Sequence, residues 1–198
     1  MSVRVDKEEL PRLEQLAERF SWFFVDRITG DGPSRMIRVL LDVPAFAACE
    51  GQLQPEVRPG PWPTRIMLSR GMAIQPLVQL ESVEGYVPFG GHITGFGRRL
   101  LRSPADAAPP GLVCYASSWD SGRTLCWVAT QTARLLTGEV LSLEAAPMSR
   151  AGRDFQAGAL ASGQLPTRVI AIPGPELLYL HALPAAANGL DIEFGEQE

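Results

Sequence analysis

Residues that bind metals or form disulfides are scarce in this sequence. Its 198 residues include three cysteines and two histidines. Cys49, Cys114 and Cys126 form neither a CxxC pair nor a Cys/His ligand pattern, which argues against a disulfide framework and against structural zinc. We therefore expect all three to be buried thiols, and we expect neither a metal nor another cofactor.

Long apolar runs and blocks of charge are also missing. No hydrophobic run is long enough to cross a membrane, and the charged first 20 residues lack the apolar core of a secretory signal. The net charge is −4 and neither sign is gathered in one block, which argues against nucleic acid or an anionic membrane surface as a partner. There is no GxSxG motif and no glycine-rich phosphate loop with a lysine. We expect a cytoplasmic protein without a membrane span.

The composition is that of a globular domain, with 45% hydrophobic and 20% charged residues, and the length suits one domain with extensions. Residues 64–80 (TRIMLSRGMAIQPLVQL) carry apolar side chains around nearly the whole circumference of a helix. A helix that is apolar all round is a buried one. We therefore predict a central core helix here, interrupted by Arg70 and Gly71 and bent near Pro76.

The segments before and after this helix predict an antiparallel sheet. Residues 6–20 have the pattern of an amphipathic surface helix, with Asp6 as its candidate cap. Two strands are expected at 20–28 and 35–43, joined by the turn TGDGPS. The proline-rich stretch 44–63 is expected to be a stiff loop without regular structure. Later strands are expected at 86–102, 111–119, 123–136 and 139–145, with hairpin turns between the last three.

Three stretches resemble the FabZ/FabA family of 3-hydroxyacyl-acyl-carrier-protein dehydratases. FFVDRITGDGP looks like that family's opening strand, RGMAIQPLVQL like its central helix, and RTLCWVATQTARLLTGEVLSLEAA like its last hairpin. The resemblance implies an α+β hotdog fold, in which an antiparallel β-sheet wraps a central α-helix. It divides the chain into an N-terminal amphipathic helix (1–19), a hotdog domain (20–148) and a C-terminal extension (149–198) that begins with a flexible stretch.

The family's dehydratases pair a histidine on the loop before the helix with a glutamate or aspartate on the helix. The matching positions of this chain hold Pro55 and Arg70. Neither side chain can act as a general base near neutral pH. The resemblance therefore implies an acyl pocket without the residues that usually perform the dehydration.

Other polar residues near those positions are candidates to replace the missing groups. We predict Glu56, His92 and Arg70 as catalytic residues. The alternatives are that Glu56 is merely solvated, that His92 is a surface or interface histidine, and that Arg70 belongs to a structural ion pair. Arg58 and Arg70 could also hold a phosphopantetheine phosphate or a carboxylate. The predicted substrate-binding residues are Arg58, Trp62, Met67, Met72 and Phe89.

The resemblance predicts a protein that acts on or binds acyl thioesters, carried by acyl carrier protein or coenzyme A, in fatty-acid or polyketide-type biosynthesis. The reaction could be that of a dehydratase, an isomerase, a cyclase or a thioesterase. The family also implies a dimer, formed either by two copies of this chain or with another hotdog protein. Two alternatives stay open: an inactive hotdog subunit that pairs with an active dehydratase, and a scaffold or interaction protein.

Overall fold

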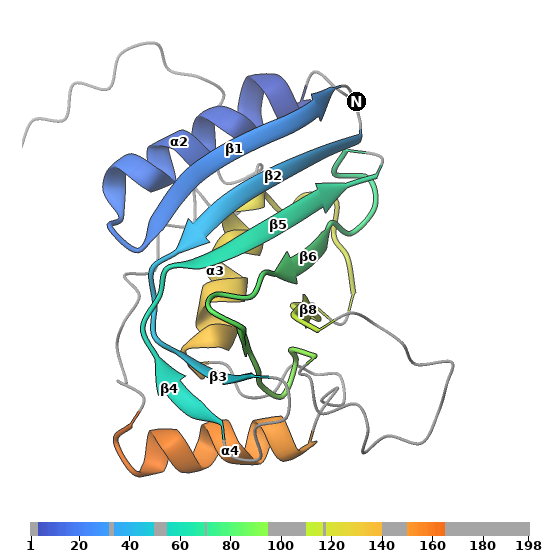
Figure 1. The fold of residues 1–198 in the computed structure, drawn as a ribbon. Helices are drawn as coiled ribbons and strands as arrows, with labels where there is room; N and C mark the ends of the chain where they lie inside the picture. The colour runs from blue at the N-terminus through green and yellow to red at the C-terminus, as the bar shows by residue number, and fades with distance from the viewer. Residues whose placement is uncertain are drawn as a thin grey trace, which may run out of the picture.

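The computed structural model describes residues 4–31, 34–49, 55–69, 71–94, 110–116, 118–139 and 150–164. These residues form an α+β fold, in which helices accompany two antiparallel sheets (Figure 1). The α+β class and the antiparallel pairing predicted from the sequence are confirmed. Several segments nevertheless adopt a different secondary structure from the one predicted for them.

The described chain begins with a helix. A π-helical turn, η1 (Val5–Glu9), continues into the α-helix α2 (Leu10–Arg19), which turns an apolar face inward and a charged face to solvent. The predicted amphipathic helix is thus confirmed. The predicted cap is wrong, because Asp6 lies within η1, where its carboxylate forms an ion pair with Arg35.

A five-stranded antiparallel sheet forms the larger layer of the fold. Its strands lie in the order β1-β2-β5-β6-β8 (Figure 1). Their bounds are β1 Phe23–Asp31, β2 Ser34–Leu41, β5 Trp62–Leu68, β6 Leu77–Leu80 and β8 Leu112–Val113. The hairpin of β1 and β2 occurs close to the two strands that the sequence predicts at 20–28 and 35–43.

A smaller antiparallel sheet continues from the larger one. Its order is β4-β3-β7, with β3 at Ala45–Cys49, β4 at Glu56–Arg58 and β7 at Tyr86–Pro88. The strands β2 and β3 follow each other along the chain, as do β4 and β5. One long, bent hairpin therefore contributes a pair of strands to each sheet.

Regular structure within residues 44–63 corrects the predicted loop. Pro44, Pro59 and Pro61 lie between strands, at the bend where the long hairpin passes from one sheet to the other. A proline has no N–H to donate, so it fits where the ladder of hydrogen bonds is interrupted. The residues on both sides of the bend pair in register.

The central helix predicted at residues 64–80 is wrong. This stretch holds β5 and β6, which pair as antiparallel neighbours. Along β5 the side chains alternate, so that Ile66 is buried and Met67 lies on the outward face. Apolar residues on both faces of the strands, such as Ile66 inward and Met67 outward, give this stretch a composition close to that of a buried helix. Gly71 and Pro76 in the connection between the strands favour a turn.

The helix that packs on the sheet is α3 (Leu125–Leu136), in a stretch for which a strand was predicted. Thr124 caps its first turn by accepting a hydrogen bond from the N–H of Trp127 at 3.1 Å. Nine of its 12 residues are buried, so α3 is the helix of this fold that is covered on nearly every side.

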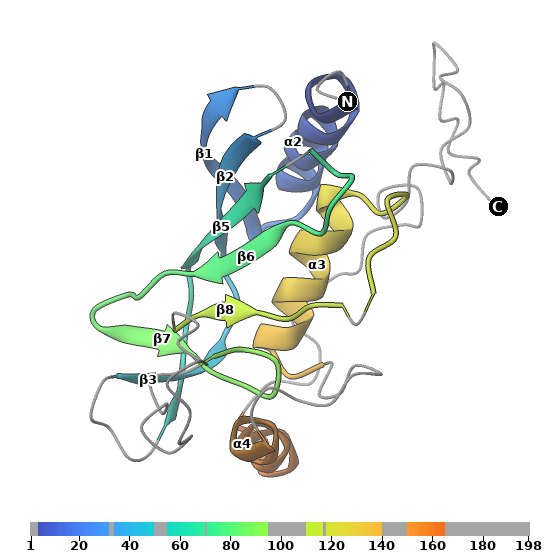
Figure 2. The ribbon, with the colours of Figure 1, turned by 90° about the vertical axis from the view of Figure 1, so that its right-hand side faces the viewer.

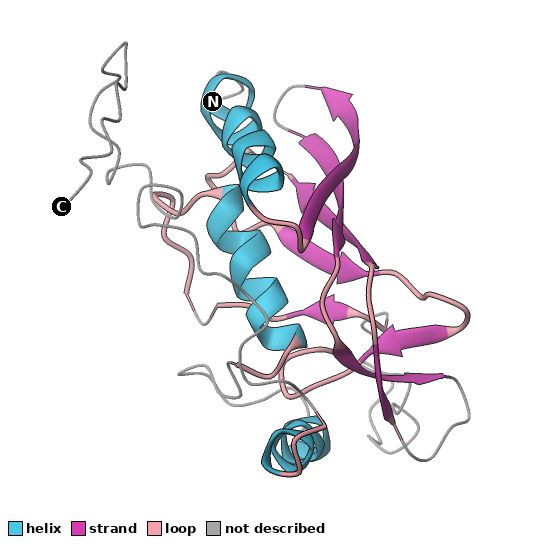
Figure 3. Cartoon of the chain, turned by 90° about the vertical axis from the view of Figure 1, so that its left-hand side faces the viewer, coloured by secondary structure: helices cyan, strands magenta, loops and turns pink. Residues whose placement is uncertain are grey.

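The helices α2 and α3 lie on the same face of the five-stranded sheet. Figures 2 and 3 show both helices on one side, and among the described residues the opposite face carries no helix. Apolar side chains of the two helices join inward residues of the sheet, such as Trp62 and Ile66, in one core cluster. The hydrophobic effect thus holds the helices to this face.

The last described helix, α4 (Arg150–Ala161), lies beside the smaller sheet (Figure 1). The start of the C-terminal extension was predicted to be flexible, and this part of the prediction is wrong. The side chain of Gln156 ties α4 to Gly91, in the turn after β7.

A buried carboxylate joins the N-terminal helix to α3. The Oε1 atom of Glu9 accepts hydrogen bonds from Nε and Nη2 of Arg4, both at 3.1 Å, and its Oε2 accepts the backbone N–H of Leu125 at 2.7 Å. The side chain of Glu9 is fully buried, and burial raises the pKa of its carboxyl group. Glu9 therefore satisfies a free N–H in the first turn of α3 and places a negative charge at the positive end of that helix.

Adjacent substitutions in β5 should distinguish the observed strand from the predicted helix. Ile66→Ala removes a side chain that is 1% exposed and should lower the free energy of unfolding by about 3 kcal/mol. Met67→Ala, on the outward face, should cost about 1 kcal/mol or less. Urea denaturation followed by circular dichroism measures both values, and equal losses would contradict the alternation.

Removal of the Glu9 carboxylate should destabilise the fold strongly. Glu9→Ala leaves the Leu125 N–H and the Arg4 guanidinium without this partner, and we expect a loss of about 3 kcal/mol in unfolding free energy. The matched control is Glu14→Ala, an exposed glutamate of α2, which should change stability by less than about 0.5 kcal/mol. Similar thermal midpoints for the two variants would refute a structural role of Glu9.

Candidate functional site

Two of the predicted site residues, Glu56 and Arg58, lie together on β4. Their charged groups are 3.6 Å apart, and Arg58 also reaches Glu84 at 3.2 Å and covers the ring of Tyr86 at 3.7 Å from its centroid. A hydrogen bond with Glu56 raises the pKa of the Tyr86 hydroxyl. These half-exposed groups satisfy one another at the surface, which is the arrangement of a structural ion-pair cluster.

The other predicted binding residues do not line one cavity. Trp62 and Met72 are buried in the main core, Met67 lies on the outward face of β5, and Phe89 packs against a separate small cluster around Phe46. Arg70 lies outside the described residues.

His92 lies in a tight turn after β7. The N–H of Ile93 bonds to the carbonyl of Gly90 across this turn, at 3.4 Å, and Gly91 and His92 form its tip. The histidine is only 1% exposed, so the alternative that His92 is a surface histidine is wrong. Burial lowers the pKa of its imidazole, which is therefore neutral at pH 7 and can accept a proton.

The turn brings His92 opposite Cys114, which directly follows β8. Ile93 pairs with Val113, and the next pair is joined by a hydrogen bond from the N–H of Cys114 to the carbonyl of His92, at 2.9 Å. Side chains of residues that lie opposite each other in an antiparallel pair are neighbours, with Cβ atoms about 5 Å apart. The fold thus brings a cysteine and a histidine together from positions 22 residues apart in the sequence.

Cys114 is partly exposed, whereas Cys126 is buried. Cys126 is buried in α3, but Cys49 and Cys114 are half-buried, so the prediction of three buried thiols holds for Cys126 alone. The Cys114 thiol donates a hydrogen bond to the carbonyl oxygen of Ala116, at 3.7 Å. Burial raises the pKa of the Cys114 thiol, which is therefore protonated at neutral pH.

The segment that follows Cys114 is anchored at several points. The hydroxyl of Tyr115 donates to the carbonyl of Pro76 at 2.6 Å, and the indole N–H of Trp119 donates to the carbonyl of Met72 at 3.0 Å. The two rings meet edge to face, with centroids 6.4 Å apart. Cys114 is therefore held between a strand and a braced loop.

The pair of Cys114 and His92 was only half predicted. The sequence analysis named His92 but assigned Cys114 to the buried thiols, because the cysteines show neither a CxxC pair nor a Cys/His ligand pattern. A reactive Cys–His pair is adjacent in space and not in sequence. The only local signal was the presence of both residues within predicted strands.

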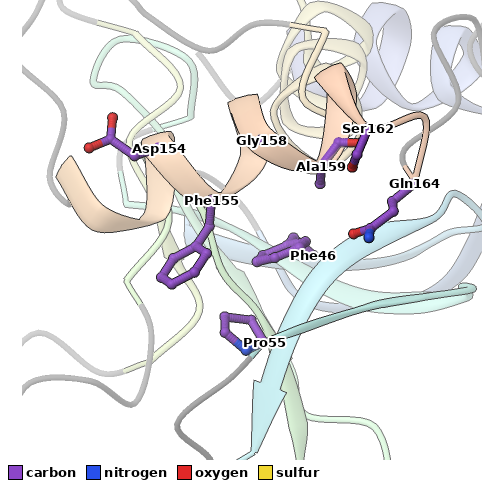
Figure 4. A pocket seen from close by; sticks show the side chains of 8 residues that line it. All are labelled: Phe46, Pro55, Asp154, Phe155, Gly158, Ala159, Ser162 and Gln164. Carbon is purple, nitrogen blue, oxygen red and sulfur yellow. The ribbon is translucent and has the colours of Figure 1, made fainter.

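A hollow of about 580 Å³ lies between α4 and the smaller sheet. Figure 4 shows Phe155 pointing from α4 toward Phe46 and Pro55, while Asp154 points away from them. The rings of Phe46 and Phe155 stack at 6.0 Å. Asp154 is exposed and paired with Arg153, so the lining has no buried acid or base, and this hollow is not suited to acid–base chemistry.

Other site types are not seen in the described part of the chain. Within it, no group of three or more histidine, cysteine, aspartate or glutamate residues is arranged to bind a metal ion. No helix there has the length and hydropathy that crossing a membrane requires.

Comparisons of the chain with models of known protein families, with curated proteins and with solved structures gave no match. The function therefore has to be derived from the chemistry of the site.

Alkylation should separate the three cysteines of the folded protein. Iodoacetamide should modify Cys49 and Cys114, whereas Cys126 should be protected, since it is buried and its pKa is raised to about 12. Because the thiolate is the reactive form, the rate at Cys114 should rise about tenfold per unit from pH 7 to pH 8. Peptide mass mapping over a pH series measures each rate, with Cys114→Ser as the control for assignment. A Cys114 rate that is already constant across this range would contradict the raised pKa.

Proposed function

We propose that this protein transfers acyl groups between thiols and carries the acyl group as a thioester on Cys114. The observation that carries the proposal is the pairing of Cys114 with His92 through their main chains. It is supported by the partial exposure of Cys114 and by the braced loop that follows it. Nucleophilic cysteines in enzymes are commonly activated by an adjacent histidine base.

The protonation states suit a base-assisted attack. The thiol is protonated and the imidazole is neutral near pH 7, so each partner starts in the form that the step requires. His92 takes the proton from the sulfur of Cys114 as that sulfur bonds to the carbonyl carbon of the incoming thioester. The bond from this carbon to the donor's sulfur then breaks, and the leaving thiolate receives the proton from His92. The products are acylated Cys114 and the free donor thiol.

This proposal keeps the substrate class expected from the resemblance to the dehydratases, and it replaces the chemistry. The hotdog assignment stays a prediction, and the segment that suggested its central helix forms β5 and β6. Glu56 is held by Arg58 on the smaller sheet and has no part in the proposed step. Acyl thioesters are retained as the substrate class because a cysteine thiol can act as a nucleophile toward an acyl carbon and form a covalent intermediate.

Incubation with a thioester should acylate Cys114. We expect the intact mass to rise by one acyl group after addition of acyl-coenzyme A or acyl-pantetheine, and hydroxylamine should remove the added mass. His92→Asn should slow the reaction about 100-fold, because a general base contributes at least that much. Time-resolved mass spectrometry measures the rates. A peptide thioester without pantetheine, used in parallel, tests whether the site recognises the acyl group or its carrier.

Cys49 provides the matched control for this experiment, since its thiol is also half-buried. Cys49→Ala should leave the acylation unchanged, Cys114→Ala should abolish it, and Cys114→Ser should give an ester that is more resistant to hydroxylamine. Acylation that persists in Cys114→Ala, or that is indifferent to His92→Asn, would defeat the proposal.

A second function, as a non-catalytic binding subunit, is favoured by the outward face of the five-stranded sheet. Phe24 and Leu77 are 44% and 49% exposed on β1 and β6. Phe24 is opposite Leu40 at one end of this face. At the other end Met36 is opposite Met67, which is in turn opposite Leu77. Exposed apolar side chains that adjoin one another often mark an interaction surface. An unreactive Cys114 would favour this second function.

A further inference from the structure

Gln156 is a buried polar residue of α4 that contacts the turn holding His92. Its side chain is 2% exposed. The amide oxygen accepts the N–H of Gly91 at 3.2 Å, and the amide nitrogen donates to the carbonyl of Leu135, in the last turn of α3, at 2.9 Å. One side chain thus connects the residue before His92 to the end of the core helix.

Two glycines allow this close approach. A Cβ atom added at Gly90 would come within 2.7 Å of the amide group of Gln156, and one added at Gly152 would lie 2.4 Å from the carbonyl oxygen of Gly90. Neither distance is possible for a real Cβ atom, so the backbone of the turn lies directly against α4. A side chain at Gly152 would meet the backbone of Gly90 and force α4 away, whereas one at Gly90 would displace the amide group of Gln156.

We infer that Gln156 is a positioning residue, which holds the Gly91–His92 turn so that His92 lies opposite Cys114. The inference rests on the acyl-transfer function proposed above. The Gly91 N–H is at the tip of the turn, and its bond to Gln156 fixes the residue immediately before the histidine. The hydrogen bond to the Leu135 carbonyl holds Gln156 itself in place, because α3 is buried in the core. Gln156 acts on the reaction only through His92.

A double-mutant cycle with His92 tests this role. Gln156→Leu should reduce the rate of Cys114 acylation about tenfold when His92 is present, and should cause no further loss in a His92→Asn background. Residues that act through one another are non-additive, whereas a general loss of stability would act equally in both backgrounds. Equal losses in the two backgrounds would overturn the inference.

Nuclear magnetic resonance of the imidazoles gives a readout that does not depend on acyl transfer. The chain has two histidines, so the spectrum of His92→Asn assigns the His92 signal. In the wild type His92 should titrate below the usual histidine range, and Gln156→Leu should move its pKa upward toward that range. An unchanged His92 titration would refute the positioning role even if the wild type proves unable to form a thioester. If Gln156→Leu shifts the pKa of His92 as expected but the wild type forms no thioester on Cys114, only the proposed function is refuted.

Matched variants separate positioning from helix stability. Ala157→Gly weakens α4 next to Gln156 without removing the amide, and should leave both the His92 titration and the acylation rate close to wild type. If Gln156→Leu fails to fold, Gln156→Met replaces it, since it keeps the length of the side chain and removes both hydrogen bonds. A shift of His92 in Ala157→Gly as large as in the Gln156 variant would show that α4 merely stabilises the fold.

Discussion

The burial of α3 is the constraint on which the rest of the structure depends. Nine of its 12 residues are shielded from solvent by the five-stranded sheet and the neighbouring helices, so the polar ends of the helix must find partners inside the protein. Glu9 accepts the N–H of Leu125 at one end, and Gln156 donates to the carbonyl of Leu135 at the other. The first and last described helices are therefore both fastened to the termini of α3. The core helix and the two polar bridges form one connected unit.

This unit explains why the fold could be predicted only in outline. The N-terminal helix follows from local periodicity, because its apolar residues face one side. The first hairpin follows from strand-forming residues on both sides of the turn TGDGPS. Residues 64–80 and α3 are both rich in apolar residues on every side, and composition alone does not decide which of the two is helical. Capping does: Thr124 accepts a hydrogen bond in the first turn of α3, whereas Gly71 and Pro76 interrupt the other stretch. The rule that an all-apolar helix is buried was sound, but it was applied to the wrong segment.

The candidate site was harder to foresee because it is made by long-range pairing. His92 could be named as one of two histidines, but its nearness to Cys114 depends on the register of Ile93 with Val113. No local sequence pattern indicates that these two residues pair. Glu56 and Arg58 illustrate the reverse case, in which two residues close in sequence did come together but in a surface cluster. Their nearness in the sequence led to an ion pair, and not to the catalytic and binding roles predicted for them.

The bent hairpin gives the molecule a limited tolerance for changes in length. The same two runs of chain supply β2 with β5 to one sheet and β3 with β4 to the other. An extra residue in only one arm of the bend would preserve the alternation of side chains in one sheet and invert it in the other, because the side-chain period of a strand is two residues. The bend also restricts the residue type at Gly60, since an added Cβ would lie 2.8 Å from the Leu41 carbonyl oxygen across the bend. Homologous chains should therefore gain or lose residues at the bend in matched pairs, and single insertions should be found elsewhere.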